Sequence, residues 1–142
     1  TYASNPLSCA IANAVLNEVV ENNLVENARV IGDYLKEGLK NLASQLSIVG
    51  DVRGRGLLLA VEVVRDAMTK SMFNFDQRAI YRISELGIKN GILLYTRKTS
   101  KGTNGEWLMI APPLISTTAH CDNFLSKLYK TLKDFEKEQG IR

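Results

Sequence analysis

Apolar residues recur at helical spacing in two adjoining stretches at the start of the chain. The first stripe consists of Leu7, Ala10, Ile11, Ala14, Val15 and Val19, and the second of Leu24, Ala28, Ile31, Leu35, Leu39 and Leu42. Residues spaced in this way share one face of a helix. Asn22 and Asn23 interrupt the pattern between the stripes. We therefore predict two helices, over residues 6–21 and 24–46, with a break or kink between them.

Shorter apolar runs follow, bounded by glycine and proline. Those over residues 47–52, 57–64, 92–96 and 107–110 are typical of strands, and the first two are joined by a glycine-rich bend. Helical spacing returns over residues 76–89 and in a last helix capped by Ser116 or Thr117. The order α-α-β-β-α-β-β-α predicts an α+β fold, a two-layer α/β sandwich with helices packed on a small, mainly antiparallel sheet. We expect residues 1–46 to form a long helical segment that leads into a small domain over residues 47–142.

Composition narrows the classes of function. The chain has 142 residues, 45% hydrophobic and 23% charged, with a net charge of +3 and scattered basic residues. These values suit a globular protein and give no reason to expect a nucleic-acid partner. No apolar run approaches the roughly 20 residues of a membrane span, so no membrane partner is expected. Cys9 lies on the apolar side of the first predicted helix, which predicts a small buried thiol, and a disulfide with the distant Cys121 is not expected.

Most catalytic motifs are missing. The run Arg53-Gly54-Arg55-Gly56 resembles a phosphate-binding loop, but the third glycine of a dinucleotide motif would fall at Leu59. A bend between strands explains it better. His120 is the one histidine, too few for a catalytic triad or most zinc sites. Every lysine falls on a polar helix face or in a loop, which is unsuited to a Schiff base. Because the chain opens without methionine on a well-capped helix, we expect it to be the downstream part of a larger protein.

Four segments in order carry a resemblance to a known family. They are residues 1–10 (TYASNPLSCA), 32–39 (GDYLKEGL), 49–59 (VGDVRGRGLLL, leading to Val61 and Glu62) and 111–114 (APPL). Together they resemble the C-terminal part of class III aminotransferases, enzymes of the pyridoxal-phosphate fold type I superfamily. The likeness covers nearly the whole chain and corresponds to roughly the last third of such an enzyme.

The resemblance implies a domain that closes over the cofactor-bearing large domain of a cytoplasmic homodimer. It implies that Thr1 reaches the phosphate of pyridoxal 5'-phosphate in the neighbouring subunit. The lysine that anchors this cofactor, and the acidic partner of its ring nitrogen, would lie upstream. The resemblance therefore implies no catalytic residue in these 142 residues and no catalysis by them alone.

One position departs from the family pattern. Many members carry an arginine two residues before the A-P-P motif to hold a substrate carboxylate, and this chain has Met109 there. The departure favours the branch that looks like the amine–pyruvate or ω-aminotransferases, in which a mobile arginine after the preceding strand takes the carboxylate. Arg97 is the candidate, although a solvated loop arginine is an equal alternative.

Two other functions stay open. The same order of elements suits a small non-catalytic α/β module that binds a ligand or a partner protein. Another member of the family, such as a decarboxylase or racemase, would share the scaffold. The resemblance favours transfer of an amino group from an amine or amino acid to a 2-oxo acid.

Overall fold

The computed structural model describes residues 4–98 and 105–141. Its elements follow the predicted order, with one short 3-10 turn added at Phe75–Gln77. They are α1 (Pro6–Glu21), α2 (Leu24–Ala43), β1 (Val49–Arg55), β2 (Leu58–Val63), α3 (Ala79–Lys89), β3 (Tyr95–Lys98), β4 (Glu106–Ile110) and α4 (Thr118–Glu138). The strands form one sheet in the order β1-β2-β4-β3, and all neighbours are antiparallel. The predicted α+β fold is confirmed.

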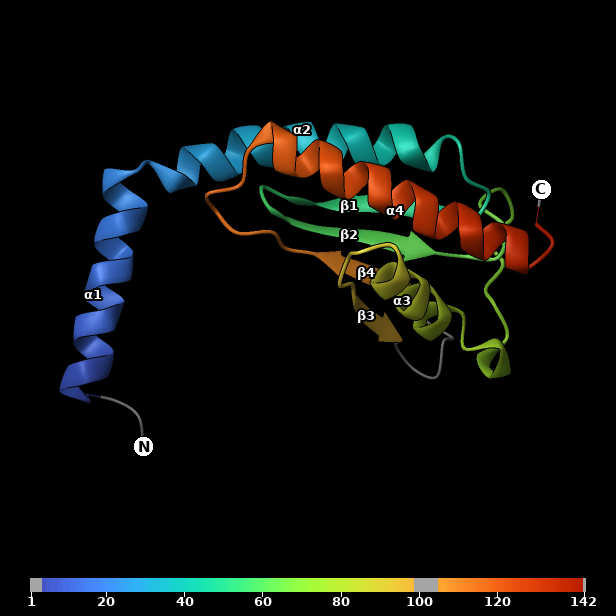
Figure 1. The fold of residues 1–142 in the computed structure, drawn as a ribbon, viewed down its shortest axis with the longest axis horizontal. Helices are drawn as coiled ribbons and strands as arrows, with labels where there is room; N and C mark the ends of the chain where they lie inside the picture. The colour runs from blue at the N-terminus through green and yellow to red at the C-terminus, as the bar shows by residue number, and fades with distance from the viewer. Residues whose placement is uncertain (1–3, 99–104, 142) are drawn as a thin grey trace.

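Three helices cover one face of this sheet. α2 and α4 run side by side along it, and α3 lies against its β3–β4 half (Figure 1). The core between the two layers draws on the three helices and on β1, β2 and β4. Examples are Leu39 from α2, Leu108 from β4 and Phe135 from α4, all fully buried. α2 thus shares one core with residues 47–142, and the expected division at residue 46 stays a prediction.

Alternation along the two central strands explains why the sheet has a covered and an uncovered face. Leu59, Val61 and Val63 of β2 are buried, whereas the residues between them are not. Leu108 and Ile110 of β4 are buried in the same manner. Since successive side chains of a strand point to opposite faces, the intervening residues of both strands lie on the face without helices.

The glycines of the β1–β2 hairpin adopt backbone conformations that a tight bend requires. Gly54 and Gly56 adopt φ values of +130° and +53°, which residues with a Cβ rarely reach. Gly32 of α2 packs directly on this bend, and a Cβ there would come within 2.2 Å of the Gly56 carbonyl carbon. The absence of a side chain at Gly32 therefore permits this close approach, and the predicted bend between β1 and β2 is confirmed.

The boundaries of β3 and α3 differ from those predicted. Residues 92–94 do not pair in the sheet, because the backbone N–H of Ile92 bonds back to the carbonyl of Gly87, 2.9 Å away, and so completes the end of α3. Pairing with β4 begins only at Tyr95. At the other end, α3 starts at Ala79 rather than residue 76, since Arg78 takes a left-handed conformation with φ +48°.

The prediction of a buried thiol at Cys9 is wrong. Cys9 is exposed, and none of the residues of α1 is buried. α1 forms as predicted, with Asn5 Oδ1 accepting the N–H groups of Leu7 and Ser8. It extends away from the helices and the sheet (Figure 1), so no element of the described residues covers its apolar side chains.

Candidate functional site

The uncovered face of the sheet presents two rows of side chains across three strands. Arg97 of β3 lies opposite Trp107 of β4, which lies opposite Glu62 of β2. In the next row, Tyr95 lies opposite Met109, which lies opposite Ala60. Side chains that face each other across antiparallel strands are about 5 Å apart at Cβ. The register therefore brings Arg97 and Met109, both singled out from the sequence, to the same end of one face.

Arg97, which was predicted to follow its strand, instead lies within the edge strand β3 and is exposed there. It makes no hydrogen bond or ion pair with any other residue that the structure describes. A guanidinium offers paired N–H donors in a planar fork that matches a carboxylate. At this position the group is able to bind a carboxylate brought to the sheet face, with Trp107 beside it as an apolar wall.

Glu62, at the far end of the same row, is engaged with another arginine. Arg53 Nη1 lies 3.4 Å from Glu62 Oε2 and 2.9 Å from Asp51 Oδ2. The hydrogen bond from Arg53 lowers the pKa of Asp51 below its ordinary value and keeps that carboxylate ionised. Arg53 is therefore neutralised within the sheet, whereas Arg97 is not.

The segment after β4, which carries the A-P-P motif, is held by a residue that sequence analysis did not single out. Asn27 Nδ2 donates to the carbonyl oxygens of Leu114, at 2.6 Å, and Ser116, at 3.1 Å. Asn27 lies on α2, more than 80 residues earlier in the chain. No local pattern could have revealed this contact. It holds residues 114–116 against α2.

His120 has a structural role. Its Nδ1 accepts the backbone N–H of Thr117 at 3.2 Å, and Thr117 Oγ1 accepts the backbone N–H of His120 at 3.4 Å. This reciprocal pair caps the start of α4, and of the two predicted caps it is Thr117 that serves. Over residues 4–98 and 105–141, no three histidine, cysteine or acidic side chains gather as a metal site would require.

The described residues do not offer a covalent anchor for pyridoxal phosphate. No lysine whose side chain the structure describes is buried, and a Schiff-base lysine needs a desolvated pocket. Thr1, the predicted phosphate ligand, lies outside the described residues. In the same part of the chain, no helix combines the length and apolar character needed to cross a bilayer.

Comparison with known proteins gives a consistent result. A family model described as Aminotransferase class-III matches residues 1–132. An uncharacterized aminotransferase from Schizosaccharomyces pombe is 34% identical over 133 residues, 93% of this chain and 29% of that protein. A leucine/methionine racemase from Thermococcus litoralis is 30% identical over 138 residues, 96% of this chain and 29% of that protein.

A solved structure agrees with the relatives. A transaminase from the marine bacterium Virgibacillus has a TM-score of 0.92 at 29% identity, covering 98% of this chain and 31% of its own. The chain thus spans about three tenths of the length of the proteins it matches. With the match over residues 1–132, it belongs to the class III aminotransferase family.

Proposed function

We propose that this chain is the C-terminal part of a pyridoxal-phosphate-dependent aminotransferase. The whole enzyme moves an amino group from an amine or amino acid to a 2-oxo acid. The observation that carries the proposal is the family match along residues 1–132. It is joined to an exposed arginine on β3, Arg97, which has no ionic or hydrogen-bonded partner among the described residues. These 142 residues alone are inactive, because the cofactor's lysine lies elsewhere in the whole enzyme.

Arg97 binds the carboxylate of the 2-oxo acid in this proposal. Its side chain is exposed on the edge strand β3, which ends one residue later at Lys98. Met109, in the neighbouring row, cannot form a carboxylate fork. Methionine at this position supports an enzyme that resembles the amine–pyruvate or ω-aminotransferase branch, in which a mobile arginine takes the carboxylate.

Thr1 binds the cofactor phosphate across a homodimer interface in this proposal, and the enzyme is cytoplasmic. A hydroxyl just before a capped helix start is a good phosphate donor. Pyridoxal phosphate supplies the electron sink for amino-group transfer, and this chain supplies binding and orientation. Replacement of Thr1 by valine tests the role, since it removes the hydroxyl at nearly constant volume. Unchanged cofactor retention would refute it.

The test of the function uses the complete enzyme that contains this chain, supplied with pyridoxal phosphate, an amine donor and pyruvate. We expect alanine and the oxidised donor to form in equal amounts, as measured by mass spectrometry. The 142-residue chain should form neither. Turnover by the 142 residues alone would overturn the proposal.

A racemase is the second candidate. The similarity to the leucine/methionine racemase of Thermococcus litoralis, at 30% identity over 96% of this chain, favours it. The same incubation with a single L-amino acid separates the two reactions. A racemase produces the D-enantiomer without pyruvate, whereas a transaminase releases the 2-oxo acid of the donor catalytically only when pyruvate is present to accept the amino group.

A further inference from the structure

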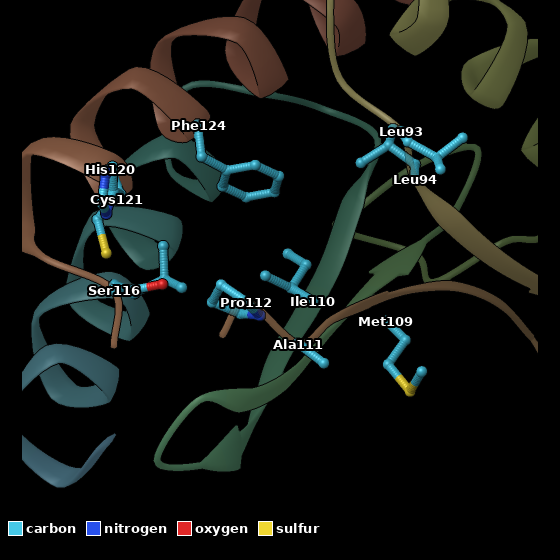
Figure 2. Close-up of a pocket in the computed structure, with 11 residues that line it drawn as sticks. Leu93, Leu94, Met109, Ile110, Ala111, Pro112, Ser116, His120, Cys121 and Phe124 are labelled. Carbon is cyan, nitrogen blue, oxygen red and sulfur yellow. The ribbon is translucent and has the colours of Figure 1, made fainter. Parts of the chain in front are cut away.

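A cavity of about 210 Å³ lies between α4, the end of β4 and the residues before β3. Figure 2 shows Leu93 and Leu94 at one end and Ser116 and Cys121 at the other, with Phe124 and Ile110 between them. Cys121 and Ile110 are almost fully buried, and Leu93 is 86% exposed. The cavity therefore has an enclosed end beside α4 and an end that reaches solvent.

The size and lining of the cavity suit one small ring. A cavity of about 150 Å³ lined by leucine, isoleucine and phenylalanine is large enough to bind benzene. This cavity is somewhat larger, and its lining has no aspartate, glutamate, lysine or arginine. It includes His120, whose Nδ1 is already occupied by the N–H of Thr117. Burial raises the pKa of the Cys121 thiol, so that group also stays uncharged. A charged ligand would find no counter-charge there.

Ser116 adds a hydrogen-bonding group at the enclosed end. The residue is only 5% exposed, and its hydroxyl forms no hydrogen bond with any described residue. Its backbone is fully used, since its N–H bonds to the Pro113 carbonyl and its carbonyl accepts from Asn27. The hydroxyl is therefore available to a ligand, and a neutral hydrogen bond to it adds modestly to affinity.

We propose that this cavity binds a small uncharged molecule with an aromatic or branched aliphatic body and one hydroxyl or carbonyl group that hydrogen-bonds to Ser116. The apolar body lies against Phe124, Ile110 and Leu94, and the polar atom meets the serine hydroxyl. The site belongs to these 142 residues and does not depend on the transfer reaction.

Three matched probes test the chemistry: benzyl alcohol, toluene and benzoate. NMR titration of the purified protein follows the methyl signals of Ile110 and Leu94, which line the cavity. We expect benzyl alcohol to bind about three- to tenfold more tightly than toluene, the effect of one hydrogen bond to a neutral partner. Benzoate should leave these signals unchanged at the same concentrations. Failure of benzyl alcohol to shift them, or equal binding of benzoate, would overturn the proposal.

The role of Ser116 has its own test. Ser116→Ala keeps the backbone hydrogen bonds of this residue and removes only the hydroxyl. We expect it to abolish the preference for benzyl alcohol over toluene while toluene still binds. Ser126→Ala, the same substitution at an exposed position on α4, should keep the preference. A preference that survives in Ser116→Ala would refute the assigned hydrogen bond.

Discussion

Two glycines of α2 differ in what stands next to them, and this difference decides their tolerance of a side chain. A Cβ at Gly32 would lie 2.2 Å from the Gly56 backbone, whereas at Gly38 it would meet the end of the Leu125 side chain at 2.3 Å. Backbone cannot move aside as a leucine methyl can. We expect Gly32→Ala to lower the free energy of unfolding by about 1–3 kcal/mol, as overpacking does. Urea denaturation followed by circular dichroism measures it.

The matched variant is Gly38→Ala. It should lower the free energy of unfolding by less than Gly32→Ala does, because Leu125 is able to change rotamer and alanine favours the helix. Equal losses for the two variants would show that contact with the β1–β2 bend does not determine the cost.

Arg97 gives the residue-scale prediction for activity. If it holds the carboxylate of the 2-oxo acid, Arg97→Ala in the complete enzyme should raise the KM for pyruvate by about 10- to 100-fold, the effect of losing a charge-assisted hydrogen-bonded pair. The KM for an amine donor without a carboxylate should change little. Steady-state kinetics with each substrate varied in turn measures both constants. Arg65→Ala, at an exposed loop position, is the control; equal increases for both substrates would contradict the role of Arg97.

At the scale of elements, the cap of α4 is a defined stabilising contact. Thr117 Oγ1 accepts the N–H of His120, and the imidazole returns a bond to the Thr117 N–H. Thr117→Ala should therefore destabilise the fold by about 1 kcal/mol, the usual cost of losing such a cap. Thermal unfolding measures this change. Thr118→Ala, at the next residue and also exposed, should reduce stability by less. A larger loss of stability in Thr118→Ala than in Thr117→Ala would exclude the assigned cap.

The link between α3 and α4 makes stability depend on pH. Asp134 accepts hydrogen bonds from Asn90, at 3.1 Å, and Lys130, at 3.0 Å, and these partners lower its pKa. A carboxyl whose pKa is lower in the folded state stabilises the fold above the unfolded pKa of about 4, and this contribution is lost as pH falls through the folded value. Asp134→Asn should therefore lose less stability than the wild type on acidification below about pH 4.

Denaturation midpoints measured between neutral pH and pH 2 test this link. Other carboxyls with lowered pKa values, such as Asp51 and Glu138, keep part of the acid sensitivity in the variant. Asp76→Asn is the control, because Asp76 makes no hydrogen bond or ion pair with another described residue. An unchanged acid profile in Asp134→Asn would contradict the assigned link.

The elements could be predicted where local pattern and tertiary packing agree. Local sequence patterns matched the structure in three places: the apolar stripes of α2 and α4, the alternation of β2, and the glycines of the β1–β2 bend. The start of β3 could not be predicted, because Ile92 completes the end of α3 and strand pairing depends on where β4 begins. The roles of Asn27 and Ser116 could not be predicted for a related reason, since both depend on contacts between distant segments.

At the scale of the whole molecule, the two layers leave apolar surface without cover. The core is closed between the sheet and its three helices, yet Leu7, Ile11, Leu16 and Val20 of α1 are more than half exposed. Glu18 and Glu21 are the only charged residues of this helix. A helix that is apolar nearly all round is typical of a buried position. If this chain is part of a larger enzyme, as we propose, the remainder of that enzyme should enclose α1.

The reaction rates of the two cysteine thiols test whether α1 is enclosed. Cys9 is exposed on α1, whereas Cys121 is buried in the core with a raised pKa, which lowers its thiolate fraction. In the 142-residue chain we expect Cys9 to react with an aromatic disulfide reagent at least about tenfold faster than Cys121, which requires opening of the fold. In the complete enzyme Cys9 should be slow as well, because α1 is covered. Absorbance of the released thiolate follows both phases, and Cys9→Ser identifies the fast one. If Cys9 reacts as fast in the complete enzyme as in the 142-residue chain, the rest of the enzyme does not cover α1. The apolar surface of that helix would then need a different partner.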